Sequence, residues 1–198
     1  MTPVAAPTAP TRRTLLRWLA LASLATPMLT HLDAAAAEGP GAPPEVAQAL
    51  PQAQVLGAGR MRYLLWDVFD ATLWTPPDFR GAQYAEHAFA LELRYLRPIS
   101  AASLVESSLK EMRRTSSIDA AKETAWTQAM QTAFADVQAG DRITGVHRPG
   151  AGTRFFFNGR LRGVVDDAAF ARAFFGIWLG AGTSEPRLRS ALLAGSTS

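Results

Sequence analysis

The chain has 198 residues, a length that allows one domain or two small ones. It contains no cysteine, which excludes disulfides, thiolate metal sites and thiol nucleophiles. Hydrophobic residues make up 48% of the chain and charged residues 19%, so the composition predicts a packed globule rather than a disordered chain.

Positive charge is concentrated near the N-terminus. The formal net charge is +3, but residues 1–37 hold three arginines and one aspartate, and the remaining chain has 17 basic and 16 acidic residues. Nucleic-acid binders of single strands combine basic grooves with interleaved aromatic residues. That pattern is missing around the arginine pairs Arg60/Arg62, Arg94/Arg97 and Arg113/Arg114. We therefore expect no nucleic-acid partner.

Residues 1–37 are typical of a bacterial export signal. Three arginines within residues 12–17 precede an apolar run over residues 18–29, and residues 34–37 are all alanine. The arginine pair is similar to the twin-arginine class of signals, with the general secretory route as the alternative. The run is shorter than the roughly 20 apolar residues that span a bilayer. We expect cleavage after residue 37, a periplasmic mature protein and no stable membrane insertion after cleavage; an uncleaved anchor is the alternative.

The remaining chain is interpreted as a flexible leader and one domain. Residues 38–52 begin with a cluster of glycine and proline, which favours a flexible leader, and no second linker interrupts residues 53–195. Residues 61–74 are rich in aromatic and β-favouring side chains and are expected to form one long or bulged strand. Alternating apolar residues over 89–95 predict a half-buried strand.

Four helices and three further strands follow from periodicity and turn signals. The helices are predicted near residues 101–114, 120–139, 168–179 and 186–193, from apolar residues three and four positions apart and from capping residues before them. The strands are predicted at residues 143–146, 153–157 and 161–165, the last two joined by the hairpin signal Asn158-Gly159. Trp126, Phe134, Phe174 and Trp178 are expected in the core. This order favours an α+β fold with helices on one side of a mainly antiparallel sheet.

Most catalytic and metal-binding chemistries lack support. Outside residues 1–37 the histidines are His87 and His147, neither in a metal-binding motif, and both are expected at the surface, with no metal and no cofactor. No G-x-S-x-G occurs. Gly57-Ala58-Gly59 lacks the third glycine of a dinucleotide loop and is expected to bend the backbone at a strand entry. Asp166-Asp167 is interpreted as a helix cap.

Arg60 and Arg62 are the polar residues of greatest interest. They flank Met61 within an apolar segment, and residues two apart in a strand point to the same face of the sheet. If this face is directed inward, both guanidinium groups can hold an anionic head group such as a carboxylate. If it is directed outward, they are solvated surface charges.

The chain resembles the bacterial chalcone-isomerase-like family over residues 53–195. The resemblance rests on six blocks: residues 56–59 leading into 66–74, then 90–96, 111–114, 140–143, 155–159 and 170–179. It implies an open-faced β-sandwich, with a large antiparallel sheet, helices over one face and a ligand cleft between them.

The resemblance also implies where a catalytic site would lie, and this chain departs from it. Chalcone isomerases use an arginine shortly after the Gly-x-Gly, and an ungapped match places Met61 there. Only a bulge would return Arg60 or Arg62 to that role. The family's tyrosine corresponds to Leu104, and its asparagine to Glu111. These departures argue against the plant reaction.

The favoured hypothesis is a non-catalytic protein that binds a small apolar or fatty-acid-like ligand, as a plant branch of this fold does. The candidate ligand-binding residues are Arg60, Arg62, Arg94 and Tyr95. One alternative is an isomerase of the intramolecular lyase type, with Arg60, Arg62 or Arg94 stabilising negative charge. Another is a periplasmic interaction protein that exposes Phe155-Phe156-Phe157, although burial on both sides explains those aromatics without a partner. The ligand and the oligomeric state stay open.

Overall fold

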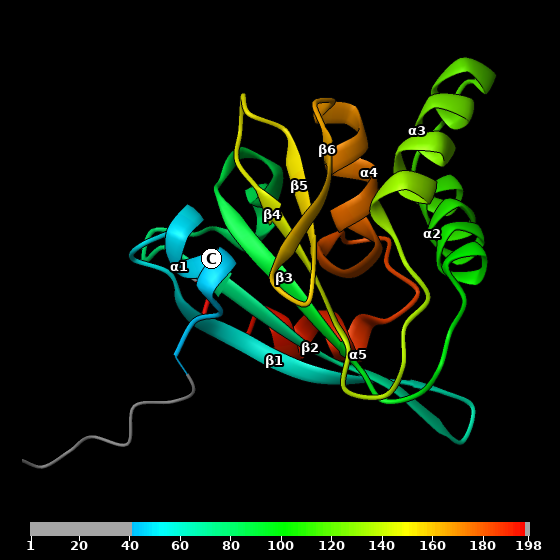
Figure 1. The fold of residues 1–198 in the computed structure, drawn as a ribbon. Coiled ribbons are helices and arrows are strands. Elements are labelled where there is room, and N and C mark those ends of the chain that lie inside the picture. Colours follow the sequence, from blue (N-terminus) through cyan, green and yellow to red (C-terminus); the bar gives the residue numbers. More distant parts are fainter. Residues whose placement is uncertain (1–40, 197–198) are drawn as a thin grey trace, which may run out of the picture. The chain divides into compact units, whose positions relative to one another are not determined.

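A six-stranded antiparallel sheet runs through residues 41–196, the part of the chain that the computed structural model describes. Each strand pairs with the next one in sequence, from β1 at one edge to β6 at the other (Figure 1). The strands are β1 (Gln54–Tyr63), β2 (Trp66–Thr75), β3 (Phe89–Tyr95), β4 (Arg142–His147), β5 (Thr153–Phe157) and β6 (Arg160–Val165).

Six helical segments accompany the sheet. They are α1 (Pro44–Ala49), the 3-10 helix η1 (Gly81–Glu86), α2 (Ala101–Thr115), α3 (Ala120–Ala133), α4 (Ala168–Leu179) and α5 (Pro186–Leu192). The three longest begin at side chains that accept hydrogen bonds from free backbone amides: Ser100, Asp119 and Asp167. These caps, read from the sequence, explain why the predicted starts of these helices are confirmed.

The main core lies between one face of the sheet, here called the inner face, and helices α2–α5. In Figure 1, α2, α3 and α4 lie to the right of the strands and α1 lies to the left. Trp126, Phe134, Phe174 and Trp178 are all buried in this core, as predicted. The α+β class with helices over one face is thereby confirmed.

The opposite face, here called the outer face, carries a smaller apolar cluster under α1. Val46 and Leu50 pack there with Trp74, Ala90 and Val146. Residues 44–49 were predicted to belong to a flexible leader (38–52), and the structure differs. The glycines and prolines signalled a loop, but Pro44 stands in the first turn of α1, where its missing N–H costs no hydrogen bond.

The segment 61–74 forms a hairpin and not the single strand predicted. Tyr63 pairs with Trp66, and Leu64 and Leu65 make the two-residue turn between them. This turn contains none of the glycine, asparagine or proline residues that usually mark a tight turn, so it cannot be predicted from local sequence. The hairpin predicted from Asn158-Gly159 is confirmed. Both residues have positive φ, at 48° and 82°, the conformation that this residue pair favours.

Gly57 and Gly59 are needed for the close packing of α5 on β1. Both lie inside β1 on the inner face, and α5 crosses them closely. A Cβ at position 57 would collide with the backbone carbonyls of Ala191 and Leu192, and one at position 59 would stand 2.8 Å from Leu188. The bend expected at the strand entry corresponds to a bulge between Val55 and Gly57, near the start of β1.

Candidate functional site

The β1–β2 hairpin ends in an apolar tip that the protein does not bury. We define the tip as residues 63–66, Tyr63-Leu64-Leu65-Trp66. Leu64 is 82% exposed and Leu65 is 97% exposed, and Tyr63 and Trp66 are exposed as well. In Figure 1 the hairpin extends beyond the neighbouring strand ends at the lower right.

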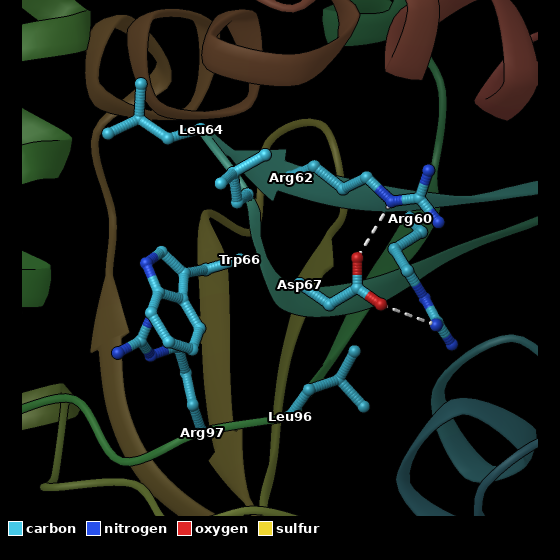
Figure 2. A pocket seen from close by; sticks show the side chains of 8 residues that line it. Arg60, Arg62, Leu64, Trp66, Asp67, Leu96 and Arg97 are labelled. Atoms are coloured by element: carbon cyan, nitrogen blue, oxygen red, sulfur yellow. Dashed lines mark hydrogen bonds and ion pairs between the residues drawn. The ribbon is translucent and has the colours of Figure 1, made fainter.

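An open groove lies along this hairpin. Its volume is about 770 Å³, and it is bounded by the hairpin on one side and by the segment after β3 on the other. Figure 2 shows its lining, which comprises Arg60, Arg62, Leu64, Leu65, Trp66, Asp67, Leu96 and Arg97. One groove thus holds apolar walls and three guanidinium groups. Two of the predicted ligand-binding residues, Arg60 and Arg62, lie in it.

The guanidinium group of Arg60 is hydrogen-bonded to two carboxylates of β2. Its Nε and one terminal nitrogen donate to Asp70 at 2.6 and 2.9 Å, and the other terminal nitrogen donates to Asp67 at 2.9 Å. These bonds raise the pKa of Arg60, those from Asp70 most. The pairs are solvent-exposed, so they fix geometry more than they stabilise the fold.

Arg62 keeps part of its guanidinium group available. Its Nε donates to Asp67 Oδ1 at 2.8 Å, and this bond is the main reason why the pKa of Asp67 is lowered. The side chain is 70% exposed. Figure 2 shows Asp67 between Arg62 and Arg60, with one carboxylate oxygen bonded to each.

Arg97 is the site residue that the sequence did not single out for binding. Its guanidinium carbon lies 5.0 Å from the centre of the Trp66 ring, a cation–π contact visible in Figure 2. Within residues 41–196 it makes no ion pair with a carboxylate. Trp66 and Arg97 are far apart in sequence, so only the folded chain reveals this available cation.

The arginines of β1 do not enter the main core. Two bulges occur in this hairpin: one has its extra residue, Leu56, near the start of β1, and the other has its extra residue, Val68, on β2, so β1 alternates from Gly57 to Arg62. Met61 therefore packs against the core while Arg60 and Arg62 are exposed. The bulge at Val68 lets Asp67 and Asp70, three residues apart, both reach Arg60.

The other two predicted ligand contacts lie elsewhere. Arg94 is exposed on the outer face, opposite Asp70 in the strand register. Tyr95 is buried in the main core against Phe69, and burial raises the pKa of its hydroxyl. The four candidates therefore do not converge on one place, and only Arg60 and Arg62 share the groove.

The predicted cleft between sheet and helices is filled. The free volume between the inner face and α4 is about 10 Å³. This is roughly the smallest cavity volume that can hold one water molecule. Aromatic rings occupy it, with Phe174 in contact with Phe155, Phe170, Phe175 and Trp178. Phe155 is buried there too, so the residues 155–157 do not present the exposed aromatic surface of the interaction-protein alternative.

The positions that correspond to the family's tyrosine and asparagine, Leu104 and Glu111, do not form a site together. Leu104 packs against the core, and Glu111 accepts a hydrogen bond from Ser184 and pairs with Arg114. His147, expected at the surface, is instead 3% exposed, with Nε2 3.0 Å from the carbonyl oxygen of Ala85. It is buried because its strand position faces the aromatic core, and burial lowers its pKa. Among the described residues no three His, Asp or Glu side chains gather as a metal site requires.

An antiparallel meander with helices over one face defines an α+β protein of the open-faced sandwich class. Residues 41–194 match the model of the chalcone isomerase-like family, and the chain belongs to that family.

Among solved structures, the fold is similar to the crystal structure of a fatty-acid binding protein of Arabidopsis thaliana. The TM-score is 0.59 at 12% identity, over 72% of this chain and 87% of that chain. A search of curated proteins gives no match. Within residues 41–196, no helix combines the length and the apolar character needed to cross a membrane.

Proposed function

We propose that this chain is an exported, non-catalytic protein that binds a small amphiphile with an apolar chain and a carboxylate, of the fatty-acid kind. The groove along the β1–β2 hairpin is the proposed site. The export part rests on residues 1–37, which lie outside the described residues.

One observation carries the proposal: the groove places the guanidinium group of Arg97, which has no carboxylate partner within residues 41–196, beside apolar walls. Its volume of about 770 Å³ lies within the range of roughly 300–1,000 Å³ common for small-molecule sites. Leu65, Trp66 and Leu96 would contact the apolar chain, and Arg97 would donate to the carboxylate. The similar Arabidopsis structure is that of a fatty-acid binding protein, which supports this ligand class.

We propose that the protein is not a catalyst because its arginines lie outside the core. Closure of a chalcone ring needs a preorganised cation where negative charge develops. Met61 is the residue directed into the core at the family's arginine position, and Arg60 and Arg62 are directed away from it. A binding role needs only the charges and apolar surface already in the groove.

Calorimetric titration with dodecanoate tests the proposal. We expect binding by the wild-type protein, about tenfold weaker binding by Arg97→Gln, and unchanged binding by the matched surface variant Arg154→Gln. Dodecanol, which lacks the charge, should bind Arg97→Gln and wild type alike. Dodecanoate binding that is absent, or that Arg97→Gln leaves unchanged, would overturn the proposal.

A further inference from the structure

The geometry points to a second role for the same hairpin: its tip, residues 63–66, docks onto a lipid bilayer that carries anionic headgroups. This inference does not rest on the proposed binding of a carboxylate, because it requires only the outward side chains of the tip and the cations behind them. It describes peripheral attachment and requires no membrane-spanning segment.

The first argument is the exposed apolar surface. Four consecutive large side chains, from Tyr63 to Trp66, remain exposed, although the same protein buries all the aromatic residues of β3 and α4. Solvent-exposed apolar clusters of this kind mark interaction sites. The two leucines lie at the turn itself, and the two aromatic residues flank them. Tyrosine and tryptophan favour the level where the apolar and headgroup regions of a bilayer meet.

The second argument is the backbone of Leu64. Its φ is 54°, in the left-handed region that suits glycine or asparagine. The β5–β6 hairpin of this protein has Asn158 at nearly the same angle, 48°. Leu64 is 82% exposed, so its side chain adds almost no buried apolar surface to the fold. The stability of the fold therefore does not explain why a leucine occupies this position. Burial of this side chain in a bilayer would explain the leucine.

The third argument is charge. The groove behind the tip is lined by three arginines and one aspartate. Arg62 retains free terminal nitrogens, and Arg97 lies on the Trp66 ring without a carboxylate partner among the described residues. When the leucines enter the apolar region, these two guanidinium groups stand one residue layer behind, where lipid phosphates lie. Guanidinium groups bind phosphate oxygens in pairs, so anionic lipids are favoured over neutral ones.

The shape of the tip favours a bilayer over a protein partner. A two-residue turn with Tyr63 and Trp66 paired below it presents a narrow, convex surface. A stable protein interface buries about 800 Å² on each partner and needs a complementary pocket. A fluid bilayer adapts to a narrow tip. The pairing of the strand ends also leaves few backbone groups without hydrogen bonds during insertion.

Vesicle co-sedimentation with the full 198-residue chain tests the inference. The vesicles contain phosphatidylcholine alone, or phosphatidylcholine with phosphatidylglycerol as about one third of the lipid, and no free fatty acid. The tip variants are Leu64→Asn and Leu65→Asn, and the charge variant is Arg97→Gln. The matched controls are Leu161→Asn, which changes an exposed leucine of β6, and Arg154→Gln on β5. Residues 1–40 are common to all variants, so a difference between two variants reports on the substituted side chain.

We expect wild type to sediment with the anionic vesicles. Each leucine variant should bind about tenfold more weakly, Arg97→Gln about fivefold more weakly, and the controls like wild type. Brominated lipid should quench the fluorescence of Trp66, because the other described tryptophans are buried, and Trp66→Phe should lower the quenching to the share contributed by Trp18, which lies outside the described residues.

Two results would overturn the inference. One is vesicle binding that the tip variants leave unchanged. The other is a concentration-dependent dimer, seen by sedimentation velocity and lost in Leu65→Asn, because a second copy would then cover the tip. Dodecanoate titration without vesicles is a separate measurement, so either proposal can fail while the other stands.

Discussion

Leu64 carries a backbone cost that a single substitution can remove. Replacing it with asparagine places at φ 54° a residue that tolerates the left-handed region and removes almost no buried surface. We expect Leu64→Asn to raise the free energy of unfolding by about 1 kcal/mol, measured by denaturant titration. Leu64→Ala keeps the Cβ and should show no such gain. Equal stabilities of the two variants would contradict this explanation.

His147 makes the fold sensitive to acid. It contacts the rings of Phe89 and Phe175, and burial lowers its pKa despite its hydrogen bond with the carbonyl oxygen of Ala85. Below about pH 6.5 the unfolded chain therefore binds this proton more readily than the folded chain. The stability contributed by neutral His147 is present above that pH and is lost as the pH falls through the folded pKa.

The measurement compares free energies of unfolding at about pH 5 and about pH 7.5. Wild type should lose more stability between these conditions than His147→Phe, which has an uncharged ring at the same position. A pH dependence identical in both proteins would assign the acid sensitivity to other groups.

At the level of elements, α1 is attached to the outer face by a buried ion pair. Glu45 accepts from Arg142 at 2.9 Å and from Thr144 at 2.9 Å, and its side chain is almost fully buried. Without Glu45, the partly buried guanidinium group of Arg142 would keep only the more distant Glu92 among the described residues, with Oε1 3.8 Å from Nε. We expect Glu45→Ala to cost about 3 kcal/mol in denaturant unfolding. Asp70→Ala breaks the exposed pair with Arg60 and should cost less than about 1 kcal/mol. Similar losses in both variants would mean that α1 contributes no more than a surface contact.

Elements with local signals were predictable, and elements defined by distant contacts were not. The caps of α2–α4 and the Asn158-Gly159 turn are determined by residues that are neighbours in the sequence. The β1–β2 turn has no turn residue, and α1 is stabilised by an arginine almost a hundred positions away. The site follows the same division: the shared face of Arg60 and Arg62 follows from strand alternation. The direction of that face, and the contact of Arg97 with Trp66, depend on the fold.

At the scale of the whole molecule, the space where a ligand cleft was expected is structural core. Phe174 contacts five other aromatic rings there. We expect Phe174→Ala to cost about 3–5 kcal/mol in denaturant unfolding, because a large cavity would remain. A loss under about 1 kcal/mol would show that this interface is loosely packed and able to admit a ligand.

The placement of charge also determines which reaction the whole fold can support. The groove holds the arginines and the core holds Met61, so no cation among the described residues faces the interface of sheet and α4. Removing a preorganised charge donor typically slows such catalysis about 100–1,000-fold. We therefore expect a chalcone to cyclise at the same rate in buffer, with wild type and with Arg62→Ala, followed by absorbance. Protein-dependent cyclisation that Arg62→Ala abolishes, while Arg154→Ala retains it, would show that the hairpin arginines act in catalysis and that the protein is an isomerase.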